Sequence, residues 1–300
     1  MRPELRLVCA AGASVSKRRT EDFARWNAWY ARLRRPVQLM VILLFILLPW
    51  VNARGWTRIY GSLFAVNIYG LPFADPLSAL QVLLIDGHVA AQLWTGALLV
   101  VLLAFALGRV FCGWLCPYGL LSELIYAVRR LLTPLLPGDA AVRSALRFRL
   151  ALCLVGLVAA CLGAFPVLQR FSMPGELSLA PLRALEGWEA CMAALLPPGV
   201  ILLAEGVSGR RLWCRYACPQ SVCLALAACC FPGAFGVKWT PGRCCCPQND
   251  RPCLRACTLG LAARQSNGPP RGECVQCAQC VSACAERGAA LRMGWQTPST

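Results

Sequence analysis

Cysteines are the residues in this chain whose type and spacing could do chemistry. The 300-residue sequence holds 20 of them, and Cys274, Cys277, Cys280 and Cys284 follow a C-x2-C-x2-C-x3-C pattern. At this spacing three thiolates can wrap one iron–sulfur cube while the fourth reaches a second cube. Zinc is the rival metal, but its sites usually combine two close ligand pairs with a longer spacer. The run therefore favours a 4Fe-4S cluster over zinc.

A two-cluster ferredoxin needs a second run, and the sequence offers an altered one. Cys253 and Cys257 supply the expected C-x3-C ending, but Asp250 and Pro247 occupy the positions of the two earlier ligands. The cysteines that can replace them through a longer loop bunch just upstream: Cys244, Cys245 and Cys246. We take Cys244 and Cys246 as the replacement ligands. The alternative is an altered or absent first cluster, so the C-terminal segment is expected to hold one or two clusters.

A Cys-x3-Cys-Pro unit occurs twice further upstream, as CGWLCPYG and CRYACPQS, each preceded by a Gly-Arg pair. Pro117 and Pro219 disfavour helical geometry at the preceding residue, yet suit the first turn of a new helix. Each second cysteine, Cys116 or Cys218, is therefore expected at a helix N-terminus. There the free N–H groups and the helix dipole stabilise a thiolate.

Together the two units supply four thiols: Cys112, Cys116, Cys214 and Cys218. Four thiolates at one depth are enough for a further cluster or another soft metal ion, and they can also act as redox-active dithiols. Buried structural thiols at a helix break are the alternative. A permanent disulfide is the least expected state if the units face the cytoplasm.

The elements that carry these cysteines are strongly apolar. The composition is 58% hydrophobic and 15% charged, with a mean hydropathy of +0.55, which indicates a membrane protein. Apolar stretches predict four spans, at about residues 37–53, 89–109, 150–168 and 190–209. The fourth is the weakest because it contains Pro197, Pro198 and Glu205.

These spans predict a mostly α fold: a four-helix integral membrane protein with a cytoplasmic ferredoxin-like (α+β) domain. The expected parts are a basic tail over residues 1–36, a membrane domain over 37–236 and the iron–sulfur domain over 237–300. A cleavable signal peptide ending near Val51-Asn52-Ala53 is an alternative for the first span. We favour an uncleaved anchor because cleavage would leave an odd number of spans.

The basic residues alternate between the two sides of this four-span arrangement. Of the 30 Lys and Arg residues, 26 fall in the tail, the middle loop and the C-terminal part, and 4 fall in the two remaining loops. The positive-inside rule then places both termini in the cytoplasm of a bacterial inner membrane. The net charge of +16 is thereby explained by the membrane surface, and no nucleic-acid partner is expected.

As a set, these features resemble the NapH/MauN group of ferredoxin-type membrane proteins, relatives of the membrane modules of NosR and CcoG. The motifs that carry the resemblance are DPLSALQVLLIDGH at 75–88, GRVFCGWLCP, WCRYACP and CVQCAQCVSAC. The resemblance implies transfer of electrons from membrane quinol towards a periplasmic redox enzyme, as in the NapH member. The MauN member implies assembly or electron transfer in methylamine utilisation.

Three functions follow: an electron carrier that moves electrons from quinol to a partner redox enzyme or ferredoxin, a maturation factor for a periplasmic enzyme such as methylamine dehydrogenase, and a redox sensor. A sensor would need an output domain, which the assigned segments leave no room for. Quinol oxidation also needs a titratable group, and His88 and Glu205 are the candidates. Each has a plainer alternative, as an interfacial histidine and as an ion-pair partner of Arg210. The chain is therefore expected to be an electron-transfer subunit, a quinol-dehydrogenase component at most.

Overall fold

The computed structural model describes residues 17–56, 58–132, 145–230, 235–240, 243–244, 246, 251–264, 268–285 and 289–295. Residues 1–16 of the expected basic tail lie outside these ranges, as do Cys245, Pro247 and Asp250.

Within the described residues, three helices are long and apolar enough to cross a membrane. They are α2 (Lys17–Ala53, with the apolar part Trp29–Ala53), α7 (Leu146–Gly163) and α10 (Trp188–Ser208). Their mean hydropathy lies between 1.8 and 2.0, and at most 22% of each apolar window is buried inside the fold. Such exposed apolar helices are unsuited to water. The chain is therefore a mostly helical membrane protein.

The structure shifts the ends of the predicted spans. Helix α2 begins at Lys17, so residues 17–36 continue into the first apolar helix without a break. Helix α7 begins earlier than expected and ends at Gly163, because Pro166 lacks the N–H that a continuing helix needs. The second predicted span forms α4 (Ala91–Leu107), which has 17 residues. At ~1.5 Å per residue its length is about 26 Å, at the lower limit for a spanning helix.

Two related loops join these helices in pairs. The first forms a small antiparallel sheet and then α3 (Pro76–Asp86); its strands are β1 (Ile59–Gly61), β2 (Ala65–Ile68) and β3 (Leu71–Ala74). The second forms α8 (Val167–Arg170) and α9 (Met173–Glu186). Both α3 and α9 begin with proline in the first turn, where its missing N–H costs no hydrogen bond. Met173, at the start of α9, is buried in the same core as Cys116 and Cys218.

Each Cys-x3-Cys-Pro unit forms a short helical turn, a break and a new helix. In the first unit these helices are α5 (Val110–Trp114) and α6 (Pro117–Leu132). In the second they are the π-helix η2 (Trp213–Ala217) and α11 (Gln220–Cys230). The break falls at the cysteine before the proline in both units, as the X-Pro geometry predicts. The predicted position of Cys116 and Cys218 just before a helix is confirmed.

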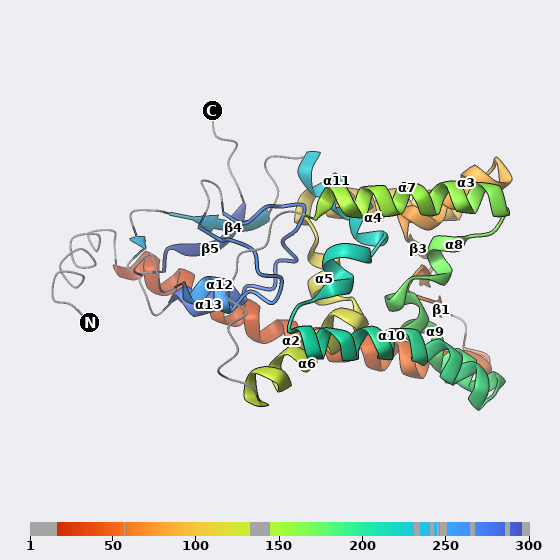
Figure 1. Ribbon diagram of the computed structural model, residues 1–300, viewed down its shortest axis with the longest axis horizontal. Helices are drawn as coiled ribbons and strands as arrows, with labels where there is room; N and C mark the ends of the chain where they lie inside the picture. Colours follow the sequence, from red (N-terminus) through yellow and green to blue (C-terminus); the bar gives the residue numbers. More distant parts are fainter. Residues whose placement is uncertain are drawn as a thin grey trace.

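The C-terminal part is a small α+β module. It contains the antiparallel pair β4 (Phe235–Trp239) and β5 (Leu291–Trp295), with α12 (Pro252–Arg255) and α13 (Gln279–Ala285). The predicted boundary between residues 236 and 237 falls within β4. Figure 1 shows this module, in blue, at one end of the molecule beside the beginning of α2, while the long helices extend towards the other end.

Candidate iron–sulfur sites

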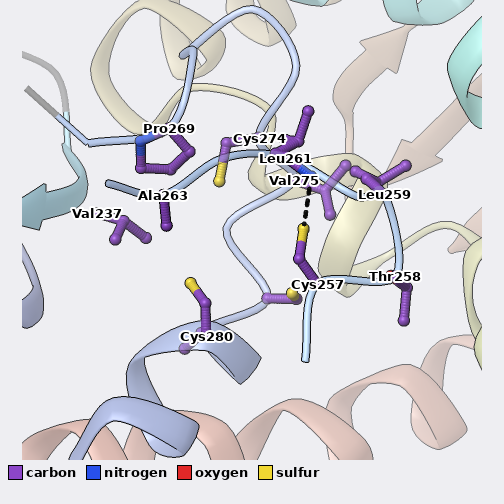
Figure 2. A pocket seen from close by; sticks show the side chains of 12 residues that line it. Val237, Cys257, Thr258, Leu259, Leu261, Ala263, Pro269, Cys274, Val275 and Cys280 are labelled. Atoms are coloured by element: carbon purple, nitrogen blue, oxygen red, sulfur yellow. Dashed lines mark hydrogen bonds between the residues drawn. The ribbon is translucent and has the colours of Figure 1, made fainter. Parts of the chain in front are cut away.

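Four cysteines from both parts of the ferredoxin-like run surround one cavity. These residues, here the central group, are Cys257, Cys274, Cys277 and Cys280. The cavity has a volume of about 20 Å³ and is otherwise lined by apolar side chains such as Val237, Leu261 and Ala263. Figure 2 shows the thiols of Cys257, Cys274 and Cys280 around this space. This is the combination expected for one ferredoxin cluster, with three ligands from the last run and one from the preceding run.

The loop of the central group has an unusual backbone. Gln276 and Ala278 adopt positive φ values of 54° and 58°, a region that residues with a Cβ rarely occupy. Such strain persists where the surroundings fix the backbone, and it concentrates at functional loops. Leu261 donates its backbone N–H to the Cys257 thiol at 3.3 Å. Backbone donors to ligand sulfurs are a feature of iron–sulfur sites.

Burial favours the neutral form of three central thiols, those of Cys257, Cys274 and Cys280, when no cation is bound. It is the largest cause that raises the pKa of Cys274 to about 12, and the neighbouring Cys277 adds to the effect. Burial likewise raises the pKa of Cys257 and Cys280. Metal binding requires thiolates, and the positive charge of iron supplies what the apolar surroundings lack. The donor set and its burial therefore fit a 4Fe-4S cluster.

A second set of cysteines is centred on Cys284, one helical turn after Cys280 on α13. Cys284 shares a buried core with Cys253 and the half-buried Cys244. The pKa of Cys284 is raised mainly by burial and also by the proximity of Cys253 and Cys244. Cys246 is half-buried. We call Cys244, Cys246, Cys253 and Cys284 the terminal group.

The two Cys-x3-Cys-Pro units come together, although they are far apart in the sequence. Their thiols, here the membrane group, are Cys112, Cys116, Cys214 and Cys218. Burial is the main reason that the pKa of Cys116 is raised well above its ordinary value, and Cys214 and Cys112 add to it. Burial and the same two neighbours raise the pKa of Cys218 to about 12. The four thiols are therefore close enough to affect one another.

The proline junctions act alike in the two units. The backbone N–H of Gly119 lowers the pKa of Cys116, and that of Ser221 lowers the pKa of Cys218. Each donor lies three residues after its cysteine, in the first turn of α6 or α11. The expected N–H stabilisation is thus present, but burial outweighs it in the free thiols.

The membrane group and the central group pack against the same apolar core. Cys112 and Cys214 pack in one apolar cluster with Cys257, Cys274 and Cys277, around Leu259, Leu261 and Val275. Gly113 lies so close to the central loop that a Cβ would sit 2.2 Å from the carbonyl oxygen of Val275. The membrane group and the central group, which come from different parts of the chain, are therefore neighbours in the folded protein.

A single metal ion and a cluster place different demands on a set of cysteines. Among the residues that the structure describes, no three His, Cys, Asp or Glu side chains converge on a position for one ion. Zinc needs all four sulfurs about 2.3 Å from a common point, whereas a cube spreads its iron atoms over four corners.

Apart from Glu205, sequence reasoning missed the set of buried charged residues around the membrane group. The arginines are Arg34, Arg109, Arg149, Arg211 and Arg215, and the carboxylates are Glu123, Glu205 and Glu273. Glu123 pairs with Arg34, with Arg35 at 3.2 Å and with Arg211 at 3.4 Å. Glu273 lies 3.8 Å from Arg149 and 4.0 Å from Arg215. The sequence signal for two of these buried residues was an arginine three residues before each unit, Arg109 and Arg211.

The two candidate titratable residues, Glu205 and His88, lie in different surroundings. Glu205, near the end of α10, is 4% exposed and accepts hydrogen bonds from the Ser122 hydroxyl and, at 2.9 Å, from the Trp213 backbone N–H. Its carboxylate contributes to the raised pKa of Cys214, after burial. His88 is exposed beyond the end of α3, with its Nδ1 2.9 Å from the Asp86 carbonyl oxygen. Only Glu205 therefore lies beside the membrane group.

Comparisons with known proteins match the cysteine units and the chain as a whole. A family model described as a 4Fe-4S binding domain matches residues 93–134 and 192–238, which contain the two Cys-x3-Cys-Pro units. No solved structure matches the chain.

Three relatives cover most of the chain. Protein NirI of Paracoccus denitrificans is 30% identical over 83% of this chain and 35% of its own length. The methylamine utilization ferredoxin-type protein MauN of Methylorubrum extorquens is 28% identical over 72% of this chain and 71% of its own. The ferredoxin-type protein NapH of Escherichia coli is 24% identical over 91% of this chain and 92% of its own. The chain thus spans about a third of NirI but most of MauN and NapH.

Ferredoxin-type relatives, the 4Fe-4S model and the apolar helices agree with the resemblance drawn from the motifs. The protein is an iron–sulfur electron-transport protein that binds 4Fe-4S clusters, and it belongs to the NapH/MauN family of ferredoxin-type membrane proteins.

Proposed function

We propose that this protein carries electrons from the quinol pool of a bacterial inner membrane, through three cysteine-bound clusters, to a partner redox enzyme or ferredoxin. The observation that supports this most is the core shared by the membrane group and the central group. Cysteines of both groups pack against the same buried residues, Leu259, Leu261 and Val275. Cys280 of the central group also shares a core with Cys253 and Cys284 of the terminal group. The three groups therefore form a continuous path from the apolar helices into the C-terminal module.

Each group supplies the ligands of one cluster in this proposal. The membrane group and the central group each provide four thiols. In the terminal group, Cys253 and Cys284 keep their usual roles, and Cys244 and Cys246 replace the ligands lost at positions 247 and 250. When bound, the clusters supply one-electron chemistry, and the cysteines hold them in an apolar setting that keeps water away.

Glu205 is the proposed proton acceptor at the membrane end. Quinol oxidation releases protons together with electrons, so it needs a titratable group beside the first electron acceptor. Glu205 lies next to Cys214, and the buried Tyr118 lies next to Glu205. Burial first, and then the Glu205 carboxylate, raises the pKa of Tyr118, so this phenol stays protonated and can donate to the carboxylate. His88 is exposed and does not lie beside the cysteines. This favours the alternative in which His88 is an interfacial residue without a role in quinol oxidation.

Four spans and cytoplasmic termini complete the proposal. Helix α4 exposes apolar side chains, with Leu98 57% and Leu102 54% exposed, as the three longer helices also do. Lipid is the environment that such a face requires. With α4 as the second span, the positive-inside count places both cysteine units, the termini and the C-terminal module on the cytoplasmic side.

Iron analysis tests the number and location of the clusters. Protein purified without oxygen should contain about twelve iron atoms per chain if three 4Fe-4S clusters are present. Cys112→Ser should lower this number by about four and remove one low-temperature EPR signal. Cys161→Ser is the matched control, because Cys161 is an exposed thiol of α7 outside all three groups. Full iron content in Cys112→Ser would remove the membrane group from the path.

Deletion of the gene separates electron transfer from maturation. If the chain is an electron carrier, the deletion strain should still contain a fully assembled partner enzyme that is active with artificial electron donors. The quinol-coupled turnover of that enzyme should be abolished. If the partner enzyme instead lacked its cofactor in the deletion strain, the chain would be a maturation factor and the carrier proposal would be wrong.

A further inference from the structure

Two arginines occupy equivalent positions in the two Cys-x3-Cys-Pro units. Arg109 lies three residues before Cys112, and Arg211 lies three residues before Cys214. Both side chains are buried, with exposed fractions of 1% and 2%. The Nη2 atom of Arg109 is 3.8 Å from the Cys112 sulfur, and that of Arg211 is 3.5 Å from the Cys214 sulfur. One guanidinium thus donates to the first thiol of each unit.

A buried guanidinium beside a cluster ligand has a defined effect on electron affinity. Arginine stays charged in proteins, so burial costs free energy unless negative charge lies nearby. A cluster held by four thiolates carries net negative charge, and reduction adds one more negative charge. A fixed cation and an N–H donor at the sulfur therefore stabilise the reduced state more than the oxidised state.

We propose that Arg109 and Arg211 set the reduction potential of the cluster held by the membrane group, raising it so that the cluster can accept electrons from a weak reductant such as quinol. This inference rests on the proposed function, since it takes Cys112 and Cys214 as cluster ligands. Both arginines act through the ligand sulfurs and are positioning residues of the electron path.

The two arginines differ in how strongly other groups neutralise them. Arg211 pairs with Glu123 at 3.4 Å and donates to the Ser122 hydroxyl at 3.2 Å and the Gly119 carbonyl at 3.2 Å. Arg109 forms no ion pair within the described part of the chain. Its Nη1 atom donates to the backbone carbonyls of Gly272 at 3.0 Å and Glu273 at 3.3 Å. The charge of Arg109 is therefore less compensated, and its removal should have the larger effect.

The partners of Arg109 also place it between two cluster sites. Gly272 and Glu273 directly precede Cys274, the first ligand of the central group. Arg109 reaches the thiol of the membrane group but only backbone carbonyls of the central loop. Its charge should therefore act more strongly on the membrane cluster than on the central cluster.

A redox titration followed by EPR, on cluster-loaded full-length protein, tests this role. Arg109→Gln should lower the potential of the signal that Cys112→Ser removes, with at least a tenfold drop in the equilibrium constant for reduction, or about 59 mV for one electron. Arg211→Gln should shift it in the same direction but less. Arg109→Lys keeps the charge and should fall between wild type and Arg109→Gln. Arg210→Gln is the control, because this arginine is exposed and next to Arg211 in the sequence.

A purely structural role would give a different result. If Arg109→Gln keeps full iron content and an unchanged potential, the inference is wrong while the proposed function stands. If Arg109→Gln loses iron, the redox titration is carried out on Arg211→Gln and Arg109→Lys instead. An unchanged reduction potential in both of these variants overturns the inference. Full iron and every EPR signal in Cys112→Ser would instead contradict the cluster assignment itself.

Discussion

Gly113 sits where the first Cys-x3-Cys-Pro unit meets the central loop. Its carbonyl oxygen accepts hydrogen bonds from Arg34 at 2.7 Å and from Gln38 at 2.8 Å, both on α2. On its other side the Val275 carbonyl approaches closely enough to exclude a Cβ. A single residue without a side chain therefore lets helix α2, the first unit and the ferredoxin-like run come together. Contact between two cluster sites depends on this packing.

Gly113→Ala should separate the two cluster sites. A methyl group at this position would meet the Val275 carbonyl oxygen at 2.2 Å, and this oxygen belongs to the backbone and cannot rotate away. Overpacking of this kind costs about 1–3 kcal/mol of stability. We expect a lower unfolding temperature in detergent and a changed magnetic interaction between the two clusters by EPR. Gly199→Ala is the control, because a Cβ there meets nothing within 4 Å. Identical behaviour of the two variants would contradict the close contact.

The sequence predicts the cysteines better than it predicts what surrounds them. The C-x2-C-x2-C spacing and Cys257 predicted the central group, because ligand spacing is local and specific. Burial of Arg109 and Glu123 depends on contacts between segments far apart in the chain, and no local pattern carries that information. A Gly-Arg pair before each unit marked the repeat, yet it could equally have been a surface charge at a membrane boundary.

At the scale of elements, the carboxylate of Glu123 joins three parts of the protein. Glu123 lies on α6 and pairs with Arg34 and Arg35 of α2 and with Arg211, just before η2. Its side chain is 1% exposed, so the ion pairs are screened little by water. Helices from both repeated halves are therefore tied to the same buried carboxylate.

Glu123→Gln should destabilise the whole bundle. Removing one partner of a buried ion pair leaves uncompensated charge and costs about 3–5 kcal/mol. Here Arg34 and Arg211 both lose their carboxylate, so thermal unfolding in detergent should occur at a clearly lower temperature. Glu189→Gln removes the same charge from an exposed position in the first turn of α10 and should change the unfolding temperature little. Equal shifts in the two variants would show that the buried pairs contribute nothing.

Element boundaries followed from the sequence where proline or long apolar runs fix them. Pro117 begins α6 as predicted, and α10 lies within two residues of the predicted span despite Pro197 and Pro198. The three-stranded sheet and helix α9 were not predicted. Short strands and a helix interrupted by Pro181 give weak local signals, and packing against α4 and α10 stabilises them.

At the scale of the whole molecule, exposed tryptophans mark the two ends of the bundle. Trp50 ends α2, Trp94 begins α4 and Trp188 begins α10; they are 50%, 47% and 75% exposed. Since α2 runs opposite to α4 and α10, all three lie at the end away from the C-terminal module (Figure 1). Trp29, 53% exposed, directly precedes Tyr30, which packs in the core of the C-terminal module. Tryptophan collects at membrane interfaces, so these residues outline the two edges of the bilayer.

Reporter fusions test the membrane orientation that the distribution of basic residues predicts. Alkaline phosphatase folds to an active form only in the periplasm, so a fusion after Gly187, between α9 and α10, should be active. A fusion within the basic stretch 109–149 should be inactive, and a fluorescent protein fused after Thr300 should fluoresce, because both positions lie on the side that holds 26 of the 30 basic residues. Activity in the 109–149 fusion would show that α4 does not cross the membrane. The cluster path would then begin on the opposite face, and electrons would enter from the other side of the bilayer.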